Sequence, residues 1–194
     1  MKIDTLETKI AEQIIKASGL DLHRDYLGIS KISDCPRVAV REYRNGITAT
    51  EQAYRMSFAG YEQERSVIGL LDGIITQINL EVVAPFDGRF KGHVDAVSEN
   101  SLIEIKSVSV NKFQKVIESG RALRSHFLQV QLYMRYGGWV QTFIIYRCRE
   151  TYEHKIIRVP YIQAEADKLE AKAKRILACI DSGEMPPCEC GRCR

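Results

Sequence analysis

Apolar residues recur at helical spacing in several segments of the 194-residue chain. Cys35-Pro36 is typical of a helix start and Asn45-Gly46 of a helix end, because proline suits the first turn and glycine the residue after the last. Gly60 and Gly73 are weak points within the longest segment. Together these patterns predict helices at about residues 4–15, 33–46, 50–78, 111–119, 125–136 and 161–181.

Shorter segments rich in β-branched residues lie between the helices and favour strands. They cover residues 80–85, 89–97, 102–108, 139–148 and 152–159. Turn residues at Asp87-Gly88 and Glu99-Asn100 separate the first three, which predicts an antiparallel meander. Helices precede the last two strands, and no repeat or linker interrupts the chain. This order predicts a single domain over residues 1–194, of class α/β (α+β), with a central mixed β-sheet flanked by helices.

Composition is that of a globular chain and argues against a membrane-spanning one. Hydrophobic residues make up 45% and charged residues 27%, with a formal net charge of +3. The best apolar stretch, Ser66 to Leu80, contains Asp72 and Gln77, so it falls short of the roughly 18 residues that cross a bilayer. The amino terminus lacks the apolar core of a signal peptide. We therefore expect a soluble, cytoplasmic protein with no membrane partner.

The positive charge is concentrated in one part of the chain. Between residues 107 and 135, a single acidic residue, Glu118, accompanies five basic ones: Lys112, Lys115, Arg121, Arg124 and Arg135. Such a stretch suits a polyanion such as a nucleic-acid backbone. A solvated helix face accounts for the charge equally well, so the neighbouring residues have to decide.

Two carboxylates face each other in the hairpin predicted around Glu99-Asn100. A turn at Glu99-Asn100 pairs residues whose numbers add up to 199. Asp95 then lies opposite Glu104, with Cβ atoms about 5 Å apart. Carboxylates this close among apolar neighbours destabilise a sheet unless a cation neutralises them. Closely spaced oxygen ligands suit Mg²⁺ or Mn²⁺, so the pair predicts a divalent-metal site.

Lys106 adds a positive charge to this pair. It follows Glu104 by two residues and therefore lies on the same face of the strand, while Ile103 and Ile105 face the core. An ammonium beside a carboxylate-bound metal orients a water and stabilises negative charge on a phosphate. A surface Glu–Lys pair opposite an unrelated Asp95 is the simpler alternative.

Polar residues also mark two of the predicted helices. Gln129 and Tyr133 are four residues apart, so they share a helix face with His126 in an otherwise apolar segment. In the earlier helix, Gly60 and Glu64 are likewise one turn apart, and Glu64 offers a further metal ligand. A solvated helix is the alternative interpretation of Glu64.

In order and spacing, these motifs resemble the RecB-like branch of the PD-(D/E)XK nucleases. The resemblance rests on Gly60-x3-Glu64, Gly92-His93-Val94-Asp95, Glu104-Ile105-Lys106 and His126-x2-Gln129-x3-Tyr133. Ser30-x-Ile32-x2-Cys35-Pro36-Arg37, with a late cysteine triplet, is similar to the CRISPR-associated iron–sulfur exonucleases of that branch. The likeness spans residues 30–193. It implies a restriction-endonuclease-like catalytic core at about residues 50–165 and a cluster region formed by Cys35 and residues 183–194.

The resemblance also implies roles for the site residues. Mg²⁺ or Mn²⁺ is held by Glu64, Asp95, Glu104 and the backbone carbonyl of Ile105. Lys106 positions the attacking water, and Gln129 and Tyr133 line the active face. The family often has histidine where this chain has Glu64, and Glu62 is the alternative ligand. Contacts with DNA are expected from His126, Lys112, Lys115, Arg121 and Arg124.

The late cysteines, Cys188, Cys190 and Cys193, form a C-x-C-x2-C cluster. Thiolates this close favour metal ligation in a reducing compartment. By the resemblance, they hold a 4Fe–4S cluster together with Cys35. The triplet of the family is usually more widely spaced, so tetrahedral Zn²⁺ and an unligated tail stay as alternatives. Cys148 and Cys179 lie in apolar-patterned segments and are expected to be ordinary buried residues.

These features predict a Mg²⁺- or Mn²⁺-dependent exonuclease that acts on single-stranded DNA and is stabilised by the cysteine cluster. An endonuclease of the same fold is one rival. A non-catalytic DNA-binding module of a recombination, repair or CRISPR-adaptation complex is another, but it has no physical need for the set of Asp95, Glu104 and Lys106. A redox protein would need only the cysteines and leaves the carboxylates unexplained.

Overall fold

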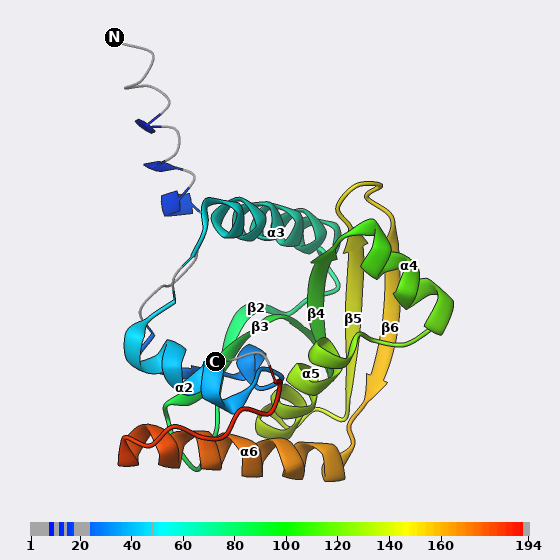
Figure 1. Cartoon of the computed structure of the whole chain (residues 1–194). Helices are drawn as coiled ribbons and strands as arrows, with labels where there is room; N and C mark the ends of the chain where they lie inside the picture. The colour runs from blue at the N-terminus through cyan, green and yellow to red at the C-terminus, as the bar shows by residue number, and fades with distance from the viewer. Residues whose placement is uncertain (1–7, 10–11, 14, 18–23, 48, 192–194) are drawn as a thin grey trace.

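A computed structural model describes residues 8–9, 12–13, 15–17, 24–47 and 49–191 of the chain. The helix predicted at 4–15 lies largely outside these residues. The helices are η1 (Ile29–Lys31, a 3₁₀ turn), α2 (Pro36–Asn45), α3 (Glu51–Leu70), α4 (Val110–Ser119), α5 (Arg124–Gly137) and α6 (Gln163–Ser182) (Figure 1). The strands are β1 (Leu27–Gly28), β2 (Gln77–Val83), β3 (Phe90–Ser98), β4 (Ser101–Val108), β5 (Gln141–Cys148) and β6 (His154–Pro160).

The strands form one mixed sheet of six strands. β2, β3 and β4 are antiparallel neighbours, which confirms the predicted meander. β4 pairs in parallel with β5 after the crossover through α4 and α5, and β5 pairs antiparallel with β6. β1, which the sequence pattern did not predict, adds two residues in parallel to the start of β3. The chain is therefore the single α/β domain with a mixed sheet that the order of elements predicted.

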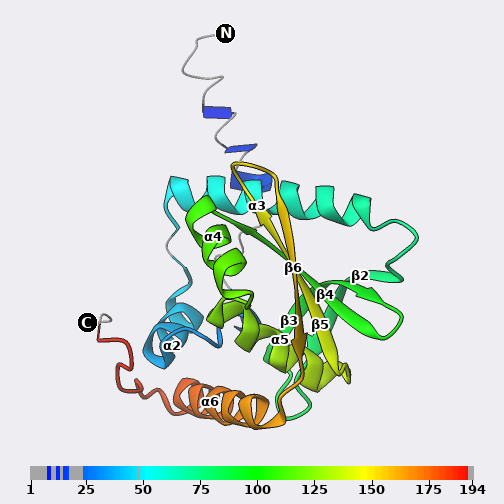
Figure 2. The same cartoon turned by 90° about the vertical axis from the view of Figure 1, so that its right-hand side faces the viewer.

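Helices cover both faces of this sheet. α3 packs on one face, where Val67 lies with Ile103 and Ile105 of β4 in a small buried cluster. α5 packs on the other face, over a larger core that includes Leu102 and Leu132, and α6 packs against α5. Figures 1 and 2 show α3 and α6 at opposite ends of the molecule with the sheet between them. Alternate residues of β4 thus face different layers, as a period of two requires.

α3 ends earlier than the sequence pattern predicts. Thr50 caps its start by accepting the Ala53 N–H, which is a common role of threonine. The helix stops at Leu70 rather than near residue 78, because the chain turns through Gly73, whose φ is +75°. The Thr76 N–H already donates to the carbonyl of Val97 on β3, so the apolar residues that follow belong to β2.

α6 carries the predicted apolar stripe over most of its length. Leu169 and Ile176 are buried, and Ile180 packs against the core. Ile162, which is predicted on the same stripe, precedes the helix as its N-cap and is 41% exposed. α6 has 20 residues, as does α3, but no helix in the described part of the chain combines the length and apolar character needed to cross a membrane.

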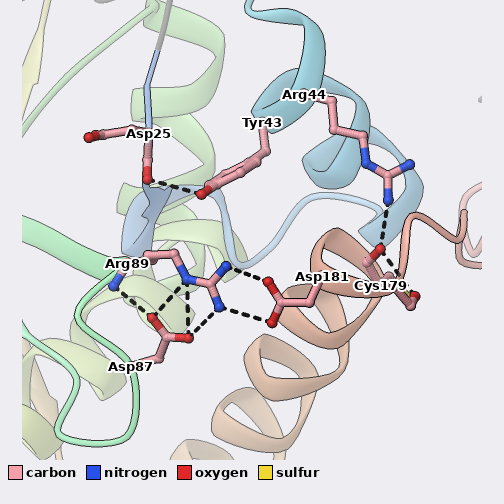
Figure 3. Close-up of polar contacts among 8 residues, drawn as sticks. Asp25, Tyr43, Arg44, Asp87, Arg89, Cys179 and Asp181 are labelled. Carbon is pink, nitrogen blue, oxygen red and sulfur yellow. Dashed lines mark hydrogen bonds and ion pairs between the residues drawn. The ribbon is translucent and has the colours of Figure 1, made fainter.

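Polar contacts fix the end of α6 against the loop between β2 and β3 and against α2 (Figure 3). The Arg89 guanidinium lies between two carboxylates, 2.7 Å from Asp87 and 3.0 Å from Asp181 of α6. Arg44 of α2 donates to the backbone carbonyl of Cys179 at 2.6 Å. The segment after α6 therefore begins at a defined position beside α2.

Candidate active site

The regular alternation of β3 breaks at Asp95. Val94 packs in the main core but Ala96 packs under α3, whereas strict alternation would place both side chains on one face. The β2–β3 register places Asn79 opposite Asp95, yet the ladder skips this pair, and Asn79 has a φ of +50°. A left-handed residue disturbs a strand, so the sheet is distorted beside Asp95.

The predicted hairpin register is confirmed, but the ladder ends one pair short of Asp95. Ala96 pairs with Ile103, so the partners sum to 199 as predicted. Beyond this pair, the Asp95 side chain accepts the Ile105 N–H at 2.6 Å. The expectation that Asp95 and Glu104 face each other across a regular ladder is therefore wrong, because β3 and β4 separate here and β4 continues beside β5.

Glu104 is buried on the α5 face of β4, with 1% of its surface exposed. Its Oε1 accepts from Lys106 Nζ at 2.6 Å and from Gln129 Nε2 at 2.8 Å. Its Oε2 is also buried and has no hydrogen-bond partner within the described residues. An unpartnered buried carboxylate oxygen is unfavourable, so this atom needs a cation or a water. Lys106 lies beside Glu104, as the strand period predicts.

Glu64 approaches the same region from α3. It lines a hollow of about 350 Å³ together with Gly60 and Lys106. A Cβ on Gly60 would meet no atom within 4 Å, so the helix leaves open space at this position. Glu64 is close enough to Asp95 for their charges to interact, whereas Glu62 is exposed. The geometry thus brings Glu64, rather than Glu62, to the carboxylates.

Burial and mutual repulsion raise the pKa values of these carboxyl groups. Burial raises the pKa of Glu104 to about 8, with a further contribution from the charge of Asp95. Burial, followed by the charge of Asp95, raises the pKa of Glu64 to about 7, and burial also raises the pKa of Asp95. Although burial opposes it, the neighbouring carboxylates raise the pKa of Lys106, so its ammonium stays charged. The positive charge of Lys106 therefore stabilises the ionised forms of all three carboxyl groups.

Gln129 and Tyr133 face this site from adjacent turns of α5, as their spacing predicts. Both are buried, and Gln129 Nε2 lies 3.2 Å from the Tyr133 hydroxyl as well as donating to Glu104. Burial, together with the charge of Glu104, raises the pKa of Tyr133, so its hydroxyl keeps the proton. A Cβ on Gly92 would lie 2.7 Å from the Tyr133 oxygen and 3.2 Å from Ile29 Cβ. β3 therefore needs glycine at this close approach.

Sequence reasoning missed two residues beside the site. Tyr146 is buried on β5 opposite Lys106, and its hydroxyl lies 3.0 Å from Nδ1 of His126. Ser107 donates to Gln63 at 2.7 Å and so joins β4 to α3. The one signal for Tyr146 is a hydroxyl in an otherwise aliphatic part of the strand, because a buried tyrosine needs a hydrogen-bond partner.

The basic residues divide into two groups. Three are exposed on α4 and in the loop that follows it: Lys112, Lys115 and Arg121. Arg124 is exposed but lies 2.7 Å from Glu165 of α6, and Arg135 lies 2.6 Å from Asp167 of the same helix. Carboxylates of α6 thus offset two of the five charges, so the positive field here is weaker than the local sequence indicates.

Cysteines meet where the segment after α6 passes the start of α2. The sulfur atoms of Cys35, Cys188 and Cys190 all lie within 4.8 Å of one another. This spacing suits a shared metal, and Cys193 lies outside the described residues. Cys148 is buried, as predicted, and Cys179 is half-buried.

No family model matches the sequence, and no curated protein matches it. Solved structures do. The LHK-Exo alkaline exonuclease of Laribacter hongkongensis, in complex with dAMP, aligns with a TM-score of 0.67 and 15% identity over 89% of this chain and 93% of that one. SSO0001 aligns with a TM-score of 0.64 and 19% identity over 86% of each chain. A phage-related exonuclease from Haemophilus somnus 129PT aligns with a TM-score of 0.58 and 12% identity over 85% and 96%.

The chain shares their fold. At these identities the likeness is one of architecture, and it agrees with the restriction-endonuclease-like core that the sequence motifs imply. The site itself fits a hard divalent cation. Its donors are carboxyl oxygens of three residues around one ammonium, a bound cation would favour their ionised forms, and Glu104 has a buried oxygen with no partner among the described residues.

Proposed function

We propose that this chain is a cytoplasmic Mg²⁺- or Mn²⁺-dependent exonuclease that hydrolyses phosphodiester bonds of single-stranded DNA. The observation that carries the proposal is the buried Glu104 oxygen, which has no partner in the described structure and lies beside two further carboxyl groups. A purely structural module has no use for this repulsion. Two of the aligned proteins are exonucleases, and one of their structures contains dAMP, a mononucleotide of the kind that an exonuclease would release.

The cation would be held by Glu64, Asp95, Glu104 and the backbone carbonyl of Ile105. The N–H and C=O of one strand residue leave the strand on the same side. Since the Ile105 N–H donates to Asp95, its carbonyl also faces the gap between β3 and β4. When bound, the cation would activate a water and share the negative charge of displacement at phosphorus.

Lys106 and α5 supply the remaining parts of the mechanism. The Lys106 ammonium, 2.6 Å from Glu104 and partly exposed, positions the attacking water and offers positive charge to a phosphate oxygen. Gln129 holds Oε1 of Glu104, and the Tyr133 hydroxyl lies against Gln129, so α5 fixes the carboxylate and lines the active face.

The exposed basic residues are proposed to hold the phosphates of the strand. They are Lys112, Lys115, Arg121 and Arg124. Their positive charges would attract DNA, and phosphate would compete with Glu165 for Arg124.

Cys35, Cys188, Cys190 and Cys193 are proposed to hold a 4Fe–4S cluster, with Zn²⁺ as the alternative. The cluster would join the start of α2 to the segment that follows α6, and so would hold these two parts of the fold rigidly together. This assignment extends the resemblance to the RecB-like, CRISPR-associated iron–sulfur exonucleases, and it makes complexes of recombination, repair or CRISPR adaptation the expected partners.

Cleavage of labelled DNA tests the proposal. The purified protein is incubated with Mg²⁺ or Mn²⁺ and end-labelled linear DNA, single- and double-stranded, and with circular single strands. Wild type should shorten linear single strands from an end, and Glu104→Gln and Lys106→Ala should lose at least about 100-fold in rate. Lys174→Ala, which removes an exposed ammonium of α6, is the matched control. Cutting of circles would identify an endonuclease, and no cutting with either metal would leave a DNA-binding module.

A further inference from the structure

The hydroxyl of Tyr146 joins β5 to the start of α5. Tyr146 is fully buried, and its oxygen accepts the backbone N–H of Leu123 at 2.9 Å. The same oxygen lies 3.0 Å from Nδ1 of His126, and the two rings pack with centroids 5.6 Å apart. Within the described residues, His126 Nδ1 is the one acceptor found for the tyrosine proton.

This arrangement selects one tautomer of His126. If Nδ1 carried a proton, the Tyr146 oxygen would accept two N–H donors, and its own buried hydrogen would lack an acceptor. A buried unsatisfied donor is unfavourable, so the tyrosine O–H donates to an unprotonated Nδ1. The proton of the neutral ring then lies on Nε2, which points away from Tyr146.

The imidazole also stays neutral. Burial, together with the positive charges of Lys106 and Lys112, lowers the pKa of His126 to about 3. His126 is half-buried, and no described residue hydrogen-bonds to its Nε2. The ring therefore presents an N–H donor without a charge.

His126 lies next to the proposed catalytic groups. It precedes Gln129 by three residues on α5, a rise of about 4.5 Å along the helix axis. Tyr146, which holds it, pairs with Lys106 on the neighbouring strand. His126 therefore lies about one turn before Gln129 on α5, and Tyr146 connects it to the strand beside Lys106.

We propose that His126 is a substrate-contacting residue whose Nε2–H donates to a non-bridging oxygen of the phosphate next to the scissile one, and that Tyr146 is the positioning residue that holds this tautomer. The inference rests on the proposed nuclease function and deepens it. A neutral donor recognises the phosphate without adding a second cation beside Lys106.

The tautomer is tested directly by ¹⁵N NMR of the histidine ring. Wild type should show an unprotonated Nδ1 and a protonated Nε2 near neutral pH, and Tyr146→Phe should give a mixture of tautomers. A protonated Nδ1 in wild type would overturn the inference. This readout needs neither DNA nor metal.

Two substitutions of His126 distinguish the loss of its Nε2–H donor from the loss of its contact with Tyr146. His126→Gln can place an amide N–H near the position of Nε2, whereas His126→Asn keeps an acceptor for Tyr146 but has no group that reaches Nε2. With Ca²⁺ and a fluorescent single-stranded DNA, the Asn variant should bind about tenfold or more weakly, and the Gln variant should recover most of the affinity. Equal binding by wild type and His126→Asn, with both folded, would contradict the proposal.

DNA in which one phosphate is replaced by an uncharged methylphosphonate identifies the phosphate that His126 contacts. A methylphosphonate at the phosphate next to the scissile one should weaken binding by wild type, and should weaken binding by His126→Asn much less, because the contact is already lost. Additive losses would overturn the assignment. If wild type binds DNA but never cuts it, the proposed function fails while the binding of His126→Asn relative to wild type still decides the contact with DNA; if wild type does not bind DNA at all, both fail.

Discussion

The Asp95 carboxylate accepts the backbone N–H of Ile105 at 2.6 Å, at the point where β3 and β4 separate. A side-chain oxygen here replaces the backbone acceptor that a continued ladder would supply. The same carboxyl group raises the pKa values of Glu64 and Glu104 through its charge. One side chain therefore ends the β3–β4 pairing and contributes to the electrostatics of the site.

Substitution of Asp95 should separate these two roles. Asp95→Asn keeps an oxygen for the Ile105 N–H but loses the charge, whereas Asp95→Ala leaves that N–H without its acceptor. We expect Asn to fold with nearly unchanged stability and Ala to lose about 1–3 kcal/mol, while both lose metal-dependent DNA cleavage. Urea unfolding and the cleavage assay measure the two effects, and full cleavage by Asp95→Asn would remove Asp95 from the metal site.

Stability should depend on pH through Glu104 in the metal-free protein. In the folded state its pKa is about 8, above the ordinary value of 4.5, so the folded chain keeps a proton that the unfolded chain has released. The free energy of unfolding contributed by this group is therefore fully present below pH 4.5 and is lost as the pH rises towards 8. Glu104→Gln should gain stability relative to wild type over this window.

The quantity to measure is the difference in unfolding free energy between wild type and Glu104→Gln. This difference is needed because His126 changes the stability of each protein in the opposite sense. Its pKa is lowered from 6.5 to about 3, so its contribution rises with pH up to about 6.5, in both proteins alike. Unfolding in EDTA at several pH values gives the difference. A difference that is constant from pH 5 to 8 would show that Glu104 titrates normally. Mn²⁺ added at the alkaline end should raise the Tm of wild type more than that of Glu104→Gln.

Gly92→Ala should disturb the contact between β3 and α5. The new Cβ would lie 2.7 Å from the Tyr133 oxygen, so Tyr133 must move, and its contact with Gln129 is lost. We expect a loss of about 1–3 kcal/mol in urea unfolding, as for overpacked cores, and reduced cleavage. Tyr133→Phe removes the crowding oxygen, so the double variant should be more stable than the sum of the single effects predicts. Wild-type stability in Gly92→Ala alone would contradict this contact.

The cysteine cluster should reveal itself by colour and metal content. Protein purified without oxygen should be brown with visible absorbance, and Cys190→Ser should lose that absorbance, because Cys190 lies with Cys35 and Cys188. Cys148→Ser is the matched control, since Cys148 is buried on β5 away from these sulfurs. A colourless wild type with stoichiometric zinc would replace iron–sulfur by zinc.

Local periodicity determined several features from the sequence alone. The two-residue period of β4 put Glu104 beside Lys106, and the turn at Glu99-Asn100 set the β3–β4 register. Helical spacing likewise put Gln129 and Tyr133 on one face of α5. These features depend on neighbours within a few residues, so the pattern of side chains is sufficient to predict them.

Other features were decided only by tertiary structure. α3 ends at Leu70 because the apolar residues after Gly73 pair with β3, and a helical pattern cannot distinguish that use from its own continuation. The separation of β3 and β4 at Asp95, the pairing of Arg124 with Glu165 and the contact of His126 with Tyr146 all join distant segments. Charge and hydrogen bonding across the fold depend on distances that no local period encodes. The sequence thus identified most of the groups of the candidate site, and the packing of α3, β3 and α5 around β4 decided how their charges and protons are arranged.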